Sequence, residues 1–308
     1  MKKNSRIYIA GHTGFLGSFV LQLLRDRGYT NLIFKSRRQL DLTDQFKTDQ
    51  FFKKYKPEYV FLFAAKVGGI YANSTYPAEF IFDNTAIQTN VIHSAYKYGV
   101  KKLLFPGSAC MYPKFCPQPM NETHILTGKI ESTNEPFGVA KICGVKMCES
   151  YNRQYKTKFI CMVPATVYGP GDHFNENGHV VAGLMQRFYE AGKNKDAQLG
   201  IWGTGKPKRE FIYVTDTAEA AVFLMKKYNG NTVINAGSGE EITMKKLASK
   251  IKDIAGIKGI LTCDVSKPDG IPRRKLDSSK IFEMGWKPKV KLDEGLMRTF
   301  EWYKKMGQ

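Results

Sequence analysis

The sequence predicts an α/β fold in which a parallel β-sheet is covered by helices on both of its faces. Short apolar runs alternate with longer segments of helical periodicity over the first 165 residues. Strands joined through helices pair in parallel, because a parallel pair needs a long crossover connection. The 308 residues are 43% hydrophobic and 24% charged, a globular balance that excludes a disordered chain. This length allows one large domain or two modest ones.

Strands and helices follow one another in order through this first part of the chain. Ile7–Ala10 is short and apolar throughout, which is typical of a strand buried on both faces. Apolar side chains at positions 19, 20, 23 and 24 share one face of a helix. The other elements follow from the same two patterns. We predict strands at 7–10, 31–34, 59–64, 102–105 and 159–163, and helices at 18–27, 46–55, 77–98 (as one helix or two) and 139–155.

The composition of the sequence changes after about residue 165. Gly, Pro, Asn and charged residues crowd the stretch from Tyr168 to Arg209. Residues 211–237 again resemble strand, helix and strand, and we expect them to return to the sheet. Further helices are predicted near 243–255 and from about Leu292. The sequence therefore predicts two domains, a larger one of residues 1–165 with 211–237, and a smaller C-terminal α/β domain of 166–210 with 238–308.

Charge and apolar patterning exclude several classes of protein. No apolar run reaches the roughly 18 residues of a membrane-spanning helix, so we expect no membrane insertion. The apolar stretch behind the basic N-terminus is short and meets Gly11 at once, which favours a strand over a signal peptide. The net charge of +19 fits an anionic substrate or cofactor, a scattered lysine bias, or nucleic acid. Because nucleic-acid motifs are missing, we expect no nucleic-acid partner.

The six cysteines carry no metal-binding pattern. None of them forms a C-x-x-C pair, and no His/Cys cluster has the spacing of a zinc site, so we expect no metal. A chain of this length also needs no disulfides to build its core. The simplest interpretation is a cytoplasmic protein whose thiols stay reduced.

A glycine-rich turn follows the first strand and opens the first helix. Its spacing is G-x-x-G-x-x-G, and glycine lets the backbone turn tightly and approach a ligand. A helix N-terminus there attracts phosphate. An ordinary loop is the alternative, but this position in an α/β chain is that of the dinucleotide-binding turn of a Rossmann-type doubly wound sheet. We expect cofactor contacts from Gly11, His12, Thr13, Gly14, Phe15, Leu16 and Gly17.

The end of the second strand indicates which dinucleotide is bound. NAD sites usually place an acidic residue here, on the ribose 2′-hydroxyl. This sequence has Lys35-Ser36-Arg37-Arg38 instead, and the guanidinium of Arg37 suits a 2′-phosphate. The sequence therefore favours NADP(H), with a solvated basic turn as the alternative. Asp41 and Leu42 follow as expected adenine contacts.

Longer motifs extend through nearly the whole chain. The most specific are A-A-K-V-G-G-I at 64–70 and C-M-Y-P-K at 110–114, and others lie at 9–12, 74–78, 136–141, 149–155, 209–211 and 266–270. With these motifs the sequence resembles the extended short-chain dehydrogenase/reductase family. Within that family it is most similar to the bifunctional epimerase-reductases of GDP-4-keto-6-deoxy-D-mannose, the GDP-L-fucose synthase type.

The resemblance implies an NADPH-dependent epimerase and reductase of a GDP-4-keto sugar. It assigns a hydrogen bond from Ser108 to the C4 carbonyl, and it makes Cys110 the base and His179 the acid for epimerisation at C3 and C5. It also implies that residues 1–165 bind NADP and that the C-terminal domain binds the substrate. Further expected cofactor contacts are Ala64, Ala65, Lys141, Pro164 and His179.

One position breaks the family pattern. Reductases of this class carry Tyr-x-x-x-Lys, in which the phenol protonates the new alkoxide, whereas this chain has Phe137 four residues before Lys141. A phenyl ring has no proton to donate, so we expect impaired reduction. The change is either engineered or a natural loss or rerouting of the proton donor.

The resemblance places the substrate grip in the C-terminal domain. Arginine suits a diphosphate and aspartate suits a ribose diol. The expected contacts are Arg187, Trp202, Arg209 and Asp269, with solvated surface residues as the alternative. Two helices, near 84–98 and 139–155, would build a four-helix interface in a homodimer.

Two other functions stay open at this point. One is the C4 reduction or C3/C5 epimerisation of a related nucleotide sugar such as a GDP-heptose, since pockets separate such substrates weakly. The other is a non-catalytic protein that binds NADP or a nucleotide sugar.

Overall fold

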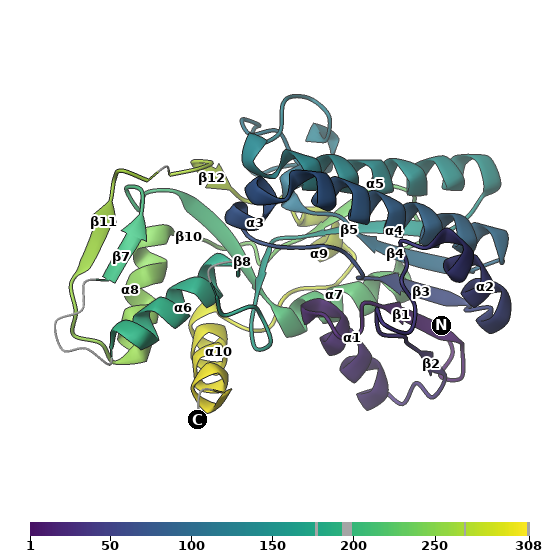
Figure 1. The fold of residues 1–308 in the computed structure, drawn as a ribbon, viewed down its shortest axis with the longest axis horizontal. Coiled ribbons are helices and arrows are strands. Elements are labelled where there is room, and N and C mark those ends of the chain that lie inside the picture. Colours follow the sequence, from purple (N-terminus) through teal and green to yellow (C-terminus); the bar gives the residue numbers. More distant parts are fainter. Residues whose placement is uncertain (176–177, 193–198, 268, 307–308) are drawn as a thin grey trace.

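The computed structural model is described here for residues 1–175, 178–192, 199–267 and 269–306 (Figure 1). One residue of the predicted motifs, Pro268, lies outside these residues. Within the described chain, no helix combines the length and the apolar character needed to cross a bilayer.

A six-stranded parallel sheet forms the centre of the N-terminal part. Its strand order is β2-β1-β3-β4-β5-β9, so the chain moves outward from β1 to β2 and then returns to β3 on the other side of β1. Ligands of such sheets bind where this order reverses, beyond the carboxyl ends of the strands. The strands are β1 (Ile7–Ala10), β2 (Leu32–Ile33), β3 (Tyr59–Leu62), β4 (Lys102–Pro106), β5 (Phe159–Pro164) and β9 (Val233–Ala236).

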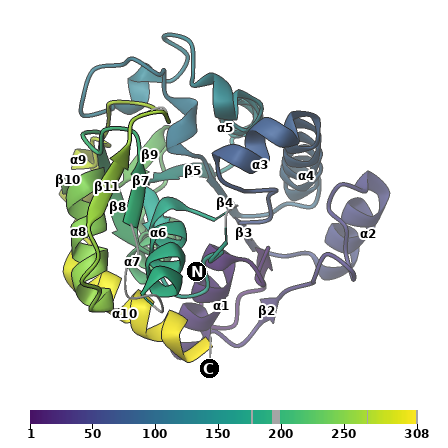
Figure 2. The same cartoon turned by 60° about the vertical axis from the view of Figure 1, so that its left-hand side comes forward.

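Helices cover both faces of this sheet. In both views, α1 lies on the opposite side of the sheet from α4 (Figures 1 and 2). The helix α1 packs against α7, while α4 and α5 pack along each other over most of their length. These elements are α1 (Phe15–Asp26), α2 (Gln45–Tyr55), α3 (Ile70–Thr75), α4 (Pro77–Lys97), α5 (Glu135–Tyr155) and α7 (Val214–Lys227), with short 3₁₀ turns η1 (Ala109–Met111), η2 (Glu122–His124) and η3 (Ser132–Asn134).

The C-terminal part has its own small sheets and its own core. The strand β8 (Lys208–Tyr213) pairs with β6 (Thr166–Tyr168), β10 (Glu241–Thr243) and β12 (Arg273–Arg274), and β7 (Leu199–Trp202) runs beside β11 (Leu261–Asp264) (Figure 2). A separate apolar cluster, which includes Phe188, Leu247 and Phe300, fills this part. The helices are α6 (Val180–Ala191), α8 (Met244–Ala255), α9 (Ser279–Glu283) and α10 (Leu292–Met306).

The predicted α/β fold is confirmed, with two local differences. Every strand predicted in the first 165 residues is present, and residues 77–97 form one helix. The helix predicted from residue 139 begins at Glu135, because Pro136 is well tolerated in a first helical turn. The helix predicted at 18–27 is observed at Phe15–Asp26. It begins three residues earlier than predicted because Gly14 already provides the N-cap, and it ends one residue earlier.

Residues 211–237 do not all return to the six-stranded sheet. The strand β9 pairs with β5 there, but β8 belongs to the second sheet. The reason is the neighbour that β8 finds: Thr166–Tyr168 continues directly beyond β5 and pairs with Phe211–Tyr213. The division of the chain into two domains remains a prediction.

Candidate active site

The glycine turn is shaped by close backbone contacts. Gly11 has a positive φ of 83°, and a Cβ built on it would lie 2.6 Å from the Ala64 nitrogen at the end of β3. A Cβ on Gly17 would lie 2.1 Å from the Gly11 carbonyl oxygen. Gly14 caps α1 without any side-chain hydrogen bond, so the first amides of the helix stay open to an anion. The turn therefore fits the pyrophosphate of a dinucleotide.

His12 presents a buried polar atom inside this turn. Its Nδ1 is buried and has no hydrogen-bond partner among the described residues, and its ring lies 4.9 Å from that of Phe34. Burial, with a smaller contribution from Arg25, lowers the pKa of His12, so the imidazole is neutral. A buried nitrogen without a partner is unfavourable unless a ligand satisfies it, which agrees with a cofactor contact here.

The basic turn after β2 leaves a guanidinium free for a ligand. The Arg37 side chain is 73% exposed, and its Nε lies 3.8 Å from Asp41 Oδ2. Burial alone would raise the pKa of Asp41, but hydrogen bonds from Thr43 and the charge of Arg37 lower it overall. Asp41 Oδ1 accepts bonds from the Thr43 amide and hydroxyl at 3.0 and 2.8 Å, so this carboxylate also shapes the loop. Leu42 is buried, and its carbonyl accepts from Asn90.

Lys141 is buried against the end of β4. Its Nζ donates to the Pro106 carbonyl at 3.1 Å and lies 5.6 Å from the centre of the Phe137 ring. Burial lowers the pKa of Lys141 to about 8, because the charged form is disfavoured away from water. Phe137 packs edge-on against Phe80 at 6.3 Å. The side chain predicted to lack a proton donor therefore stands directly beside the lysine.

Ser108 and Cys110 occupy the turn after β4. The Ser108 hydroxyl accepts the Cys110 amide at 3.2 Å and so begins the 3₁₀ turn η1. A Cβ on Gly138 would lie 2.9 Å from the Cys110 carbonyl oxygen, so the first turn of α5 packs directly onto this segment. The close packing places Cys110 next to the turn of α5 that carries Phe137.

Two donors from distant parts of the chain meet at the Cys110 sulfur. Asn134 Nδ2 donates to Sγ at 3.1 Å, and Arg274 Nη1 lies 3.9 Å from the same atom. Arg274 is also the register partner of Arg209, through the pairing of β12 with β8. Arg274 thus joins the predicted base to the predicted substrate-binding surface.

His179 stands at the N-terminus of α6 in contact with a carboxylate. Its Nδ1 donates to Asp172 Oδ1 at 2.9 Å, and the Asp172 side chain is buried. Burial acts to lower the pKa of His179, but the hydrogen bond and charge of Asp172 raise it overall. This partner favours the protonated imidazole, which is the form that an acid needs. Among the contacts of the described residues, none links His179 directly to Cys110.

Three of the four predicted substrate residues lie at one corner of the C-terminal part. Asp269 accepts from the Thr204 amide and hydroxyl at 2.6 and 2.8 Å, and a Cβ on the neighbouring Gly270 would lie 3.7 Å from Arg209. Trp202 is 61% exposed at the end of β7. Burial and the nearby Arg274 lower the pKa of Arg209 to about 10.

Arg187 is the fourth predicted substrate residue. Its guanidinium donates to the Gly183 and Gly200 carbonyls, the second of these at 3.2 Å, on the strand that carries Trp202. This places Arg187 close to β7, and its substrate contact stays a prediction.

Sequence reasoning missed three residues of this site. Arg274 lies in a basic run, Asp172 follows the turn-forming Gly169-Pro170-Gly171, and Asn134 precedes the predicted helix, but no spacing rule relates them to Cys110 or His179. Their contacts depend on pairings between distant segments.

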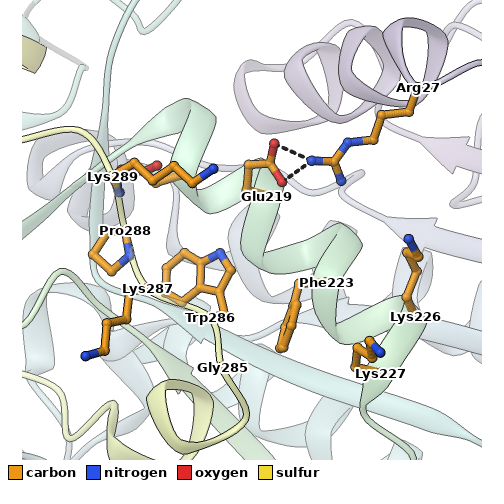
Figure 3. A pocket seen from close by; sticks show the side chains of 11 residues that line it. Arg27, Glu219, Phe223, Lys226, Lys227, Gly285, Trp286, Lys287, Pro288 and Lys289 are labelled. Atoms are coloured by element: carbon orange, nitrogen blue, oxygen red, sulfur yellow. Dashed lines mark hydrogen bonds and ion pairs between the residues drawn. The ribbon is translucent and has the colours of Figure 1, made fainter.

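A pocket of about 520 Å³ lies elsewhere on the molecule (Figure 3). An ion pair between Arg27 and Glu219 closes one side of it, and Trp286 and Phe223 lie on its wall. The lining comes from Arg27, directly after α1, from residues 216–227 along α7, and from 285–289. This pocket contains none of the predicted site residues and is separate from the candidate active site.

Comparison with known proteins identifies the same family as the motifs. The model of the NAD dependent epimerase/dehydratase family matches residues 7–237. GDP-L-fucose synthase 1 of Arabidopsis thaliana is 51% identical over 304 residues, covering 98% of this chain and 94% of that protein.

Two solved structures from Campylobacter jejuni are similar over 99% of both chains. A GDP-6-OMe-4-keto-L-xylo-heptose reductase has a TM-score of 0.94 at 38% identity. A GDP-mannoheptose C4 reductase with NADP bound has a TM-score of 0.91 at 40% identity. The family model covers well over half of the chain, and the likeness to solved structures extends over nearly all of it. The chain belongs to the NAD dependent epimerase/dehydratase family.

Proposed function

We propose that the protein is an NADPH-dependent epimerase and reductase of a GDP-4-keto sugar. The observation that supports this most is that Ser108 and Cys110 lie in the turn after β4, while α5 packs on this turn and its Lys141 donates to Pro106 at the end of β4. A dinucleotide-type glycine turn lies at the same edge of the sheet, beside the end of β3. The relatives named GDP-L-fucose synthase and GDP-heptose reductase support the nucleotide-sugar substrate.

Epimerisation needs a proton acceptor and a proton donor beside a ketone. The C4 carbonyl acidifies the C–H bonds at C3 and C5, and Cys110 removes the proton while the electron pair moves onto the C4 oxygen. Ser108, whose hydroxyl oxygen accepts the Cys110 amide, would donate its own proton in a hydrogen bond to that oxygen. His179, with its raised pKa, returns a proton to carbon.

Reduction needs a proton at the C4 oxygen as well as a hydride. NADPH would supply the hydride, and the Gly11–Gly17 turn and Arg37 would hold it. Lys141 would hold the cofactor ribose and polarise a neighbouring phenol, but Phe137 offers none. We therefore propose that this step is slow in the protein as it stands.

A GDP-4-keto-heptose is a second candidate substrate, and the two Campylobacter reductases favour it. The two candidates can be separated by incubating the protein with NADPH and each GDP-4-keto sugar. Loss of NADPH absorbance and NMR of the product would report reduction and epimerisation separately. Cofactor and sugar binding with no change in either sugar would instead indicate a non-catalytic binding protein.

Removing the Arg37 guanidinium is expected to reduce the preference for NADPH. An exposed guanidinium can make charge-assisted bonds to the 2′-phosphate, so Arg37→Ala should weaken NADPH binding by about 10- to 100-fold and leave NADH binding unchanged. Titration of both cofactors would measure this, with Lys53→Ala on the exposed face of α2 as the charge-matched control. Equal NADPH affinity in the parent and Arg37→Ala would exclude Arg37 as a phosphate contact.

We also propose a homodimer built on α4 and α5. Large apolar side chains are exposed along these paired helices, namely Phe82, Ile81, Val139 and Tyr155. A two-fold axis beside them would form a four-helix interface that buries these groups. Light scattering at micromolar concentration should give twice the chain mass, whereas the mass of a single chain would rule the dimer out.

The proposed compartment is a reducing cytoplasm. All six cysteines are free thiols, and Cys110 has to remain unoxidised to accept a proton.

A further inference from the structure

Asn134 occupies a capping position but does not cap its helix. It is the N-cap residue of α5, where asparagine usually accepts a bond from a backbone amide of the first turn. Here its side chain makes no capping bond, and its Nδ2 donates to Cys110 Sγ at 3.1 Å instead. The Asn134 side chain therefore makes its hydrogen bond to the Cys110 sulfur and none to the backbone of α5.

This contact favours one role for the sulfur. A hydrogen-bond donor aimed at Sγ is satisfied by a sulfur lone pair, and bonds to a charged acceptor are about twice as strong as neutral ones. Arg274 adds a positive charge 3.9 Å from the same atom. Both contacts therefore converge on the sulfur, the atom that would take the carbon proton.

Asp172 favours the protonated form of His179. Its Oδ1 accepts from His179 Nδ1 at 2.9 Å and from the His173 amide at 2.8 Å, while its Oδ2 is buried without a partner among the described residues. A buried carboxylate with little other compensation strongly favours a cationic neighbour. The bond also fixes the proton on Nδ1 and leaves Nε2 as the ring nitrogen available to a substrate.

We propose that Asn134 and Asp172 are positioning residues that fix the direction of proton transfer, Asn134 by holding Cys110 as the acceptor and Asp172 by holding His179 as the donor. In one epimerisation the thiolate takes the carbon proton and forms S–H, the C–H electron pair becomes the C=C bond of an enolate, and the carbonyl π pair moves to the C4 oxygen. The imidazolium then gives its Nε2 proton to the opposite face, and the pair returns to carbon. His179 is left neutral, with its Nδ1–H still hydrogen-bonded to Asp172. Exchange with water then removes the proton from the Cys110 sulfur and returns one to Nε2. The proposal rests on the proposed function.

The Asn134 half can be tested without substrate. The rate at which iodoacetamide alkylates Cys110 at pH 7, followed by mass spectrometry of the peptide, should fall at least about tenfold in Asn134→Ala, because a bond to a charged acceptor is lost. Asn134→Ser should behave in the same way while keeping a residue that can cap α5. Ser132→Ala, in the same 3₁₀ turn, is the matched control, and the exposed Cys143 provides an internal reference.

The Asp172 half has an independent readout. In Asp172→Asn the carboxamide oxygen can still accept the His173 amide, so the loop is preserved while the charge is lost. The pKa of His179, followed by NMR of its ring, should fall because its anionic partner is gone. Asp253→Asn, exposed on α8, serves as the control.

The two halves should separate in these measurements. Asn134→Ala should leave the pKa of His179 unchanged. Asp172→Asn should leave the rate of Cys110 alkylation close to that of the parent protein. Unchanged alkylation in both Asn134 variants, or an unchanged His179 titration in Asp172→Asn, would overturn the corresponding half. If both substrate-free shifts appear but no GDP-4-keto sugar undergoes exchange, the proposed function fails and the positioning roles stand.

Discussion

Replacing Phe137 by tyrosine is expected to raise NADPH-dependent reduction by about 10²–10⁴-fold, the usual contribution of a positioned general acid. The site is already arranged for a phenol, since the Phe137 ring lies 5.6 Å from Lys141 Nζ and packs against Phe80. The added hydroxyl would share this surrounding with the buried Lys141, and a nearby ammonium group stabilises a phenolate and so makes the phenol a better acid. The fold should tolerate the change because the two side chains have nearly the same shape.

Single-turnover NADPH oxidation with a GDP-4-keto sugar measures this gain. Phe115→Tyr adds a phenol on an exposed side chain outside the site and should have no effect. The double variant Phe137→Tyr with Lys141→Met should lose most of the gain if the lysine acts through the phenol. A parent protein that oxidises NADPH as fast as Phe137→Tyr would show that another residue or a water donates the proton.

The fold of the N-terminal part could be predicted because its signals are local. Apolar runs and helical periodicity each lie within one segment, and the connection through a helix already requires parallel pairing. The placement of β8 could not be predicted in this way, since it depends on pairing with β6, β10 and β12 from distant parts of the chain. Its two ends pair with different strands, which no local pattern records.

The residues of the candidate site likewise divide into those with a local sequence signal and those without one. The glycine turn could be recognised because it brings backbone close to backbone, which only glycine permits at Gly11 and Gly17. Cys110 and His179 were found through a family resemblance, not through their spacing. Asn134 and Asp172 could not be predicted, because the partner of a single polar residue is decided only when folding brings distant segments together.

We expect epimerisation to survive the loss of reduction that we propose for Phe137. The enolate also places charge on the C4 oxygen, so the missing phenol should slow this reaction too, but in the proposed mechanism the protons that move belong to carbon and pass through Cys110 and His179. We therefore expect the protein as it stands to exchange solvent deuterium into C3 or C5 of a GDP-4-keto sugar while oxidising little NADPH. NMR of the recovered sugar would measure the exchange.

Cys110→Ser should abolish this exchange and leave NADPH binding intact. A serine hydroxyl is a far weaker acid than a thiol. The two groups that contact Cys110 Sγ, Asn134 at 3.1 Å and Arg274 at 3.9 Å, would therefore not make the serine oxygen basic enough to remove the carbon proton. The cofactor turn lies on another segment of the sheet edge and does not depend on this side chain. Cys143→Ser, exposed on α5, is the matched control and should keep full exchange. Exchange that persists in Cys110→Ser at the parent rate would assign the base to a different residue.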